Sequence, residues 1–367
     1  MKTLLYIIKH EKVILLSFIA FALLNHIHFV PEDHPLYVSQ LLFLSVFFIM
    51  MYGVFNVVKH AHVIAEILGE PFGTLILTLS VIIVEVALIM AVMLAGKAEP
   101  TLARDTMFSV IMIAINGFAG LSLLIGGIKH RFQEYHLGGA NAYLALLIPL
   151  AVFCLILPNT ITTASGGQLS NTNLLVISSV CVILYSTFLV MQTVTHSDYF
   201  TLELATSNEK KDAQNCSASS ASFHIVFLVL SLVGMILLSK KLAIYLDYNL
   251  TASGLPMSLS GFIIAFLILM PEGYSAVFAS LKNQLQKSVN LCLGSALASI
   301  CLTIPAVALI SLLMGKQLLL GLSASNATLL GITLLLSITT FTGKTTNFLN
   351  GAVHLAILFV YFALLFH

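Results

Sequence analysis

Two glutamates lie near the middle of strongly apolar segments of this chain. Glu85 lies within residues 75–96, and Glu272 lies within residues 261–280. A carboxylate in the hydrocarbon region of a bilayer is costly, so it is tolerated chiefly where it faces a cavity, a partner or a transported ion. Because desolvation disfavours its charged form, such a group can hold a proton at neutral pH or be neutralised by a hard cation. Competition between proton and cation for the same oxygens is enough to couple two opposite fluxes.

The charge of the two glutamates indicates which cation they suit. Two facing carboxylates supply two negative charges, and Ca²⁺ accepts about six to eight oxygen ligands in irregular geometry. A secondary active antiporter that exchanges cytoplasmic Ca²⁺ for external H⁺ is therefore the leading hypothesis. Exchange of Na⁺ or K⁺ for H⁺ at the same carboxylates stays open, and a cation channel is a further alternative.

Other polar side chains in the apolar segments are weaker ligand candidates. Most hydroxyl groups in membrane helices serve packing. The candidates near the two glutamates or in the following helices are Thr78, Ser80, Ser109, Asn116, Ser295 and Ser299. Pro271 and Gly273 flank Glu272. They predict a helix break at that site, because proline removes a backbone donor and frees a carbonyl.

Several histidines are candidates for gating or pH sensing, because imidazole titrates near neutrality. His60, His62 and Glu70 precede the Glu85 segment, and His354 lies in the last apolar segment. The alternative for the first three is a solvated helix end. The alternative for His354 is a hydrogen-bonded structural role.

The composition restricts the class of protein. Hydrophobic residues make up 59% of the chain and charged residues only 8%, whereas a soluble domain carries about 25% charged residues. The chain is therefore expected to be an all-α polytopic membrane protein whose surroundings are the lipid bilayer. The net charge of +1 gives no basic stripe for nucleic acid. No nucleotide-binding loop, cofactor motif or catalytic constellation is present in the sequence, so we expect neither an enzyme nor a cofactor.

About eleven apolar segments are long enough to span a membrane as helices. They cover residues 12–30, 36–58, 71–96, 105–128, 140–158, 172–195, 223–240, 256–281, 287–314, 325–341 and 347–366. Placing the N-terminus in the cytoplasm puts most of the Lys and Arg residues on the inside, as the positive-inside rule requires. This topology puts the C-terminus in the periplasm.

The segments divide into two blocks of five around a polar linker. The predicted organisation is an extra N-terminal helix in residues 1–30, a first repeat in 36–195, a cytoplasmic linker in 196–222 and a second repeat in 223–367. Because five is odd, the second repeat is inverted relative to the first. Inverted repeats with a site near the bilayer midplane are typical of secondary transporters. We therefore expect Glu85 and Glu272 to meet there, one from each repeat.

Four segments resemble a known family. Residues 62–94 with 104–127 are similar to the first repeat, residues 261–307 to the second repeat, and residues 342–362 to the last helix, of the ChaA-type bacterial calcium/proton antiporters in the calcium/cation antiporter superfamily. This resemblance implies an eleven-helix antiporter of the bacterial inner membrane that exports Ca²⁺, and also Na⁺ or K⁺, against protons. It implies that Glu85 and Glu272 are the cation and proton ligands.

The chain departs from the wider superfamily next to both acids. Many relatives read G-N-x-x-E before the key glutamate, whereas this chain has Val81 and Ile82 in the first repeat and Ile268 and Leu269 in the second. The helix-loosening glycine and the asparagine ligand are both missing. The selectivity of those relatives therefore does not carry over. Stoichiometry and oligomeric state are not encoded in any recognisable motif.

Overall fold

The computed structural model describes residues 11–26, 31–69, 72–95, 100–161, 169–200, 218–343 and 345–366. Within these ranges the chain is almost entirely helical, and its one sheet is a ribbon of β1 (Gln133–Glu134) and β2 (Thr345–Thr346), which pair antiparallel. Glu70 and most of the predicted linker 196–222 lie outside the described residues. The all-α fold predicted from the sequence is confirmed.

The described ranges contain a long series of helices. Those of the first part of the chain are α2 (Lys12–His26), η1 (Pro31–Asp33), α3 (Leu36–Leu68), α4 (Phe72–Ala95), α5 (Leu102–Ile111), η2 (Met112–Ala119), α6 (Gly120–His130), α7 (Leu137–Ala151), η3 (Val152–Ile156), α8 (Pro158–Ile161), α9 (Asn171–Val190), η4 (Met191–Thr195) and η5 (Ser197–Tyr199). The later ones are α11 (Ala218–Ala252), α12 (Ser258–Leu281), α13 (Leu285–Ala298), η6 (Ser299–Thr303), α14 (Ile304–Leu313), α15 (Ala324–Thr340) and α16 (Phe348–Leu364).

These helices match the predicted membrane spans. In the described ranges, eight continuous helices are long and apolar enough to cross a membrane, and three shorter apolar helices cover Lys12–His26, Ala324–Thr340 and Phe348–Leu364. The eight and the three correspond one by one to the eleven predicted spans. The chain is a multi-pass membrane protein.

Two spans extend well past their predicted ends. α3 continues ten residues beyond residue 58, through Lys59 and His60, to Leu68. α11 continues through Lys240 and Lys241 to Ala252. The sequence placed helix ends at these charged residues, but Lys59 and Lys241 bond to groups on neighbouring segments. Lys241 Nζ, for example, donates to the carbonyl oxygen of Leu24 at 3.2 Å.

The chain forms two compact units, each assembled from distant parts of the sequence. Unit 1 contains residues 1–99 and 207–260, and unit 2 contains residues 100–206 and 261–367. Each unit therefore takes helices from both predicted repeats. The predicted repeats are defined by internal symmetry, which a division into compact units does not test. The repeat boundaries therefore stay a prediction.

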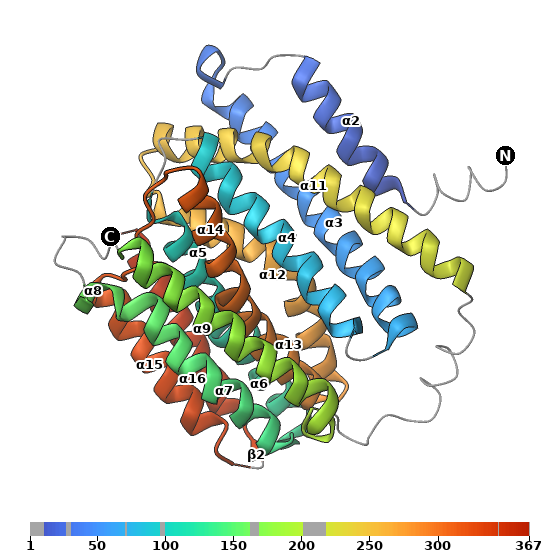
Figure 1. Cartoon of the computed structure of the whole chain (residues 1–367), viewed down its shortest axis with the longest axis vertical. Coiled ribbons are helices and arrows are strands. Elements are labelled where there is room, and N and C mark those ends of the chain that lie inside the picture. The colour runs from blue at the N-terminus through green and yellow to red at the C-terminus, as the bar shows by residue number, and fades with distance from the viewer. Residues whose placement is uncertain are drawn as a thin grey trace. The chain divides into compact units, whose positions relative to one another are not determined.

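Unit 1 is built from α2, α3, α4 and α11, with α11 packed against the other three (Figure 1). α3 presents a continuous buried face to its neighbours. The buried residues of that face recur at three- and four-residue intervals, as a helix packed on one side requires. They are Val46, Met50, Val54, Val57, Ala61 and Ile64.

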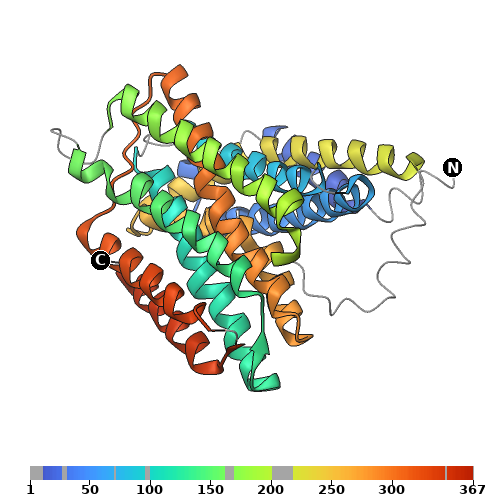
Figure 2. The same cartoon turned by 60° about the horizontal axis from the view of Figure 1, so that its bottom comes forward.

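Unit 2 is built around the continuous helix formed by α5, η2 and α6. In the most apolar 18-residue stretch of this helix, 78% of the residues are buried, which is the highest share among the eight spans. α13 packs against η2, and α16 packs against η2 and α6. α15 and α16, in red in Figure 2, form a hairpin at the C-terminal end of the chain.

Close contact between α6 and α16 depends on glycine. A Cβ atom built on Gly351 would lie 2.3 Å from the Leu124 nitrogen and 2.5 Å from the Gly120 oxygen. These are backbone atoms, which cannot move aside. Small residues allow membrane helices to approach in this way, and van der Waals contact then holds them together.

Candidate functional site

Glu85 lies in the middle of α4 and is fully buried in unit 1. It is the only ionisable residue of Phe72–Ala95. The residues around it on the helix, including Val84, Leu88 and Ile89, are buried and apolar. A carboxylate in the middle of such an apolar helix is a candidate for a functional group, and the role of Glu85 stays a prediction.

Thr78 and Ser80 lie on the same helix at different distances from Glu85. Thr78 shares the face of Glu85 but precedes it by seven residues, which is about 10 Å along a regular helix. Ser80 is buried, and its hydroxyl donates to the Ile76 oxygen at 2.6 Å. Their role as ligands stays a prediction.

Glu272 lies on α12 and lines a small cavity inside unit 2. The cavity has a volume of about 10 Å³, room for roughly one water molecule. Its other lining residues come from η2, α12 and α13: Ala114, Phe118, Leu269, Gly273, Leu291, Cys292 and Ser295. Ser295, one of the predicted weaker ligands, therefore shares this cavity with the carboxylate.

The cavity is shaped by direct contact between a ring and a helix backbone. A Cβ atom built on Gly273 would lie 2.4 Å from three carbons of the Phe118 ring. Only glycine at this position lets Phe118 of η2 pack onto α12 beside Glu272. Gly273 thus serves close packing.

The predicted helix break at Pro271 is wrong. α12 runs from Ser258 to Leu281 with Pro271 inside it. Proline removes one backbone donor, and membrane helices tolerate that loss when nearby groups supply compensating contacts. Ser275 donates its hydroxyl to the Pro271 oxygen at 2.8 Å, a bond within the same helix that does not replace the backbone donor that Pro271 lacks.

The helices that follow the two glutamate helices both contain π-helical segments. η2 interrupts the helix after α4, and η6 interrupts the helix after α12. π-helical segments inside α-helices occur frequently at functional sites because they re-aim the side chains of one turn. η2 carries Ala114 and Phe118 toward Glu272, and η6 begins at the predicted ligand Ser299.

Asn116 of η2 takes part in a different set of contacts. Its Oδ1 lies 2.8 Å from His354 Nδ1, and its Nδ2 donates to Thr333 Oγ1 at 2.8 Å. His354 Nε2 lies 3.1 Å from Thr340 Oγ1. A neutral His354 that donates from Nδ1 and accepts at Nε2 satisfies the whole chain of bonds. Asn116 and His354 are therefore brought together, and both link η2 to α15 and α16.

Ser109 is engaged in a similar way. Its hydroxyl donates to the Asp105 oxygen at 2.6 Å, so the Tyr361 hydroxyl, also at 2.6 Å, donates to Ser109. The contact joins α5 to α16. Ser109 and Ser299 do not line the Glu272 cavity, and their role as ligands stays a prediction.

His60, one of the histidines predicted from the sequence, belongs to a cluster of ionisable side chains in unit 1. His60 is fully buried and contacts Glu11 and His224, while His62 lies partly buried on the same helix. Glu11 and His224 were not selected from the sequence. Each is polar at the start of an apolar segment, which by itself is ordinary, and only the fold shows that the three meet.

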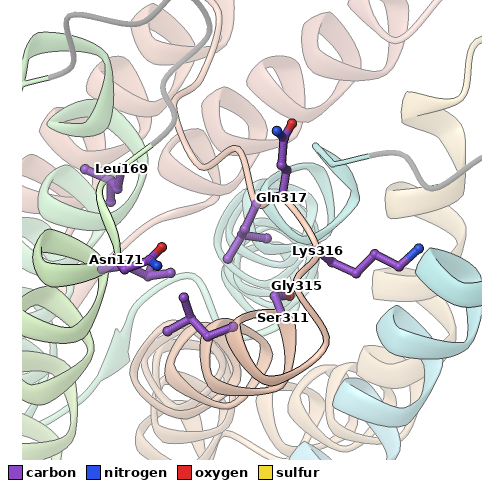
Figure 3. Close-up of a pocket in the computed structure, with 9 residues that line it drawn as sticks. Leu169, Asn171, Ser311, Gly315, Lys316 and Gln317 are labelled. Carbon is purple, nitrogen blue, oxygen red and sulfur yellow. The ribbon is translucent and has the colours of Figure 1, made fainter.

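A larger cavity of about 200 Å³ lies in unit 2 near the start of α9 and the end of α14. Figure 3 labels Leu169, Asn171, Ser311, Gly315, Lys316 and Gln317 among its lining residues. None of the lining residues that the structure describes is acidic. The described lining therefore offers a lysine and no carboxylate to a ligand.

Similar proteins were found by family, by sequence and by structure. The family model described as "Sodium/calcium exchanger protein" matches residues 38–194 and 223–367. The chain is 41% identical over 316 residues to the sodium-potassium/proton antiporter ChaA of Escherichia coli (strain K12), covering 85% of each chain. It is 24% identical over 265 residues to the Ca²⁺/H⁺ antiporter ChaA of Bacillus subtilis (strain 168), covering 72% of this chain and 73% of the relative.

The fold is similar to a solved structure. The structure of native YfkE aligns with a TM-score of 0.74 at 18% identity and covers 96% of this chain and 98% of that chain. At this level of identity the likeness concerns the fold. It agrees with the helix order described above.

Proposed function

We propose that this chain, which belongs to the sodium/calcium exchanger family and is a cation/proton antiporter, exchanges cytoplasmic Ca²⁺ for external H⁺. The proposal is carried by one observation: each predicted repeat holds one carboxylate near the middle of an apolar helix, Glu85 buried in α4 and Glu272 at the cavity of α12. Together they supply the two negative charges that a divalent cation requires. The B. subtilis relative is named as a Ca²⁺/H⁺ antiporter.

In the proposed cycle, proton and cation bind to the same oxygens in turn. The outward-facing protein releases the cation, and the two carboxylates then take up protons. The inward-facing protein releases these protons to the cytoplasm and binds the next cation. Neutralisation in both loaded states lowers the cost of holding the carboxylates within the membrane. Movement of helix groups about the site would switch access.

A second candidate is Na⁺/H⁺ or K⁺/H⁺ exchange by the same carboxylates. The observation in its favour is the 41% identity to a relative named as a sodium-potassium/proton antiporter.

The location that accompanies this function is the bacterial inner membrane, with the N-terminus in the cytoplasm and the C-terminus in the periplasm. The distribution of Lys and Arg supports that orientation. A reporter domain fused after residue 367 is then periplasmic. A cytoplasmic signal from the reporter contradicts the topology.

The function is tested in inverted membrane vesicles that contain the protein. After the vesicles are acidified, Ca²⁺, Na⁺ or K⁺ is added and proton efflux is followed by dequenching of acridine orange. We expect Ca²⁺ to release protons, and Glu85→Gln or Glu272→Gln to abolish the release at unchanged expression. Glu134→Gln, at an exposed glutamate of β1, is the matched control. Release by Na⁺ or K⁺ alone selects the second candidate, and normal exchange in either variant refutes the role of that glutamate.

A further inference from the structure

Three segments of unit 1 bring ionisable side chains together at one buried point. Glu11 directly precedes α2, His60 lies on α3, and His224 lies near the start of α11. The side chains of Glu11 and His60 are only 3% and 0% exposed. Buried ionisable groups of this kind are costly unless they are paired. This cluster is separate from Glu85, which lies on α4.

The contacts of Glu11 fix its charge. Its Oε2 accepts from Asn56 Nδ2 at 3.1 Å and lies 3.0 Å from His60 Nε2, and its Oε1 accepts from Lys59 Nζ at 3.4 Å. Asn56 and the ammonium group of Lys59 both donate to this carboxylate, which is therefore ionised. An ionised carboxylate only accepts, so His60 Nε2 carries the proton of their contact. Burial alone would raise the pKa of Glu11, but the bonds from His60 and Asn56 and the charges of His60 and Lys59 lower the pKa below its ordinary value.

The contact between the two histidines fixes a second proton. His60 Nδ1 and His224 Nδ1 are 2.8 Å apart, a hydrogen-bond distance that accommodates one proton between them. In a neutral His60 that donates from Nε2, the Nδ1 atom accepts. His224 therefore donates from Nδ1, and its own Nε2 has no proton. The neutral cluster is thus an ordered relay from His224 through His60 to Glu11.

We propose that Glu11, His60 and His224 form a proton-binding site of unit 1 that takes up one proton without rearrangement and a second only by losing the hydrogen bond between α11 and α3. The inference goes beyond the exchange at the two glutamates and rests on the proposed antiport function for its physiological meaning. In the predicted topology the N-terminus and the linker before α11 are cytoplasmic. The site then reports the cytoplasmic proton concentration.

The first proton is accommodated by a shift along the relay. It binds to His224 Nε2, and the proton on His224 Nδ1 moves across the 2.8 Å contact to His60 Nδ1. His60 is then a cation that donates to both Glu11 and His224, while His224 is neutral with its proton on Nε2. Every hydrogen bond of the cluster survives, and the new charge lies next to the Glu11 carboxylate.

The second proton has no such place. A charged His224 carries protons on both ring nitrogens, so its Nδ1–H would face the Nδ1–H of a charged His60. Two donors and two positive charges cannot remain 2.8 Å apart. His224 then leaves His60, and because His224 lies on α11 while His60 lies on α3, a hydrogen bond between the two helices is lost at this end.

The surrounding charges act on this equilibrium in opposite directions. Burial opposes proton binding at both rings. In the described part of unit 1, the charges that act on both rings are those of Glu11, which favours proton binding, and Lys59, which opposes it. Lys59 has a half-exposed side chain, so its effect is partly screened by solvent. α4 packs against α3 and α11 and contributes Glu85 as its only ionisable residue, and α2 contributes Lys12 and His26.

Hydrogen exchange of the purified full-length protein tests the proposal without any measurement of transport. Amide exchange of residues 221–231 is followed by mass spectrometry between about pH 7.5 and about pH 5.5, the range in which histidine titrates. After correction for the intrinsic pH dependence of exchange, we expect a several-fold gain in the wild-type protein at acid pH. His224→Gln, which keeps a hydrogen-bonding side chain but does not titrate, should lose this gain.

Two further variants complete the experiment. His26→Gln, at an exposed histidine at the end of α2, is the matched control and should behave as wild type. Lys59→Gln removes the opposing charge, so the gain should appear at higher pH; this variant covers the case in which His224→Gln does not fold. No acid-dependent gain in the wild type, or an unchanged gain in a folded His224→Gln, overturns the proposal. Because no cation flux is read, its failure is distinct from a failure of exchange in the vesicle assay.

Discussion

At the scale of single residues, this protein uses buried polar groups in three different ways. Glu85 and Glu272 are carboxylates in apolar helices, and we propose that they bind the cation and the protons. Asn116 and His354 form fully engaged hydrogen bonds that connect helices. The cluster of Glu11, His60 and His224 holds protons that can shift along its hydrogen bonds. A polar residue in the hydrocarbon region is therefore not by itself a sign of an ion ligand. Its hydrogen-bond partners show whether it connects helices instead.

The Asn116 contacts predict a measurable contribution to stability. Asn116→Ala removes the oxygen that accepts from His354 Nδ1 and the amide that donates to Thr333 Oγ1. Both bonds lie in a buried region. We expect a loss of about 1–3 kcal/mol in the free energy of unfolding, measured by denaturation of the purified protein in detergent. Thr328→Ala removes a hydroxyl that donates to Ala324 on an exposed part of α15; as the control, it should cost less than about 0.5 kcal/mol. If the two variants are equally stable, the bonds of Asn116 are not structural.

The sequence alone locates acids but not their partners. Glu85 and Glu272 could be selected because a charge in an apolar run needs no other information to stand out. The contacts of Asn116 with His354, and of His60 with Glu11 and His224, join residues 49 to 238 positions apart. Nothing local marks such pairs, so only the packing of the helices reveals them.

At the scale of helices, hydropathy predicts which segments span but not where they end. Lys59 and the pair Lys240 and Lys241 interrupt the apolar pattern, yet α3 and α11 continue through them. Lys59 and Lys241 bond to groups on neighbouring segments, which offsets the cost of holding their charges in these helices. Pro271 likewise leaves α12 continuous. Tertiary contacts override these local signals.

The glycine contact between α6 and α16 supports a prediction at this scale. Gly351→Ala places a methyl group against the backbone of Leu124 and Gly120, so α16 must move outward. We expect a destabilisation of about 1–3 kcal/mol from overpacking, measured by thermal denaturation in detergent. Gly331→Ala on α15 is the matched control, because a Cβ atom there meets nothing within 4 Å. Equal thermal stability of the two variants would show that α6 and α16 do not approach as closely as described.

At the scale of the whole molecule, the two compact units do not coincide with the two predicted repeats. Each unit combines helices from both halves of the sequence, and each holds one of the two glutamates. Such exchange of helices between halves makes neither half a separate folding unit. An antiporter built in this way can change the environment of both carboxylates through a rearrangement of helix groups.

The central claim is that proton and cation compete for Glu85 and Glu272. It is tested most directly by the protons released when the purified protein binds Ca²⁺, measured by calorimetry in buffers of different ionisation enthalpy. We expect release of about one to two protons per Ca²⁺ near neutral pH, because each carboxylate holds a proton before the cation arrives. Glu85→Gln and Glu272→Gln should each reduce this release together with binding. Tight Ca²⁺, Na⁺ or K⁺ binding without proton release, or release that is unchanged in both variants, would contradict the claim.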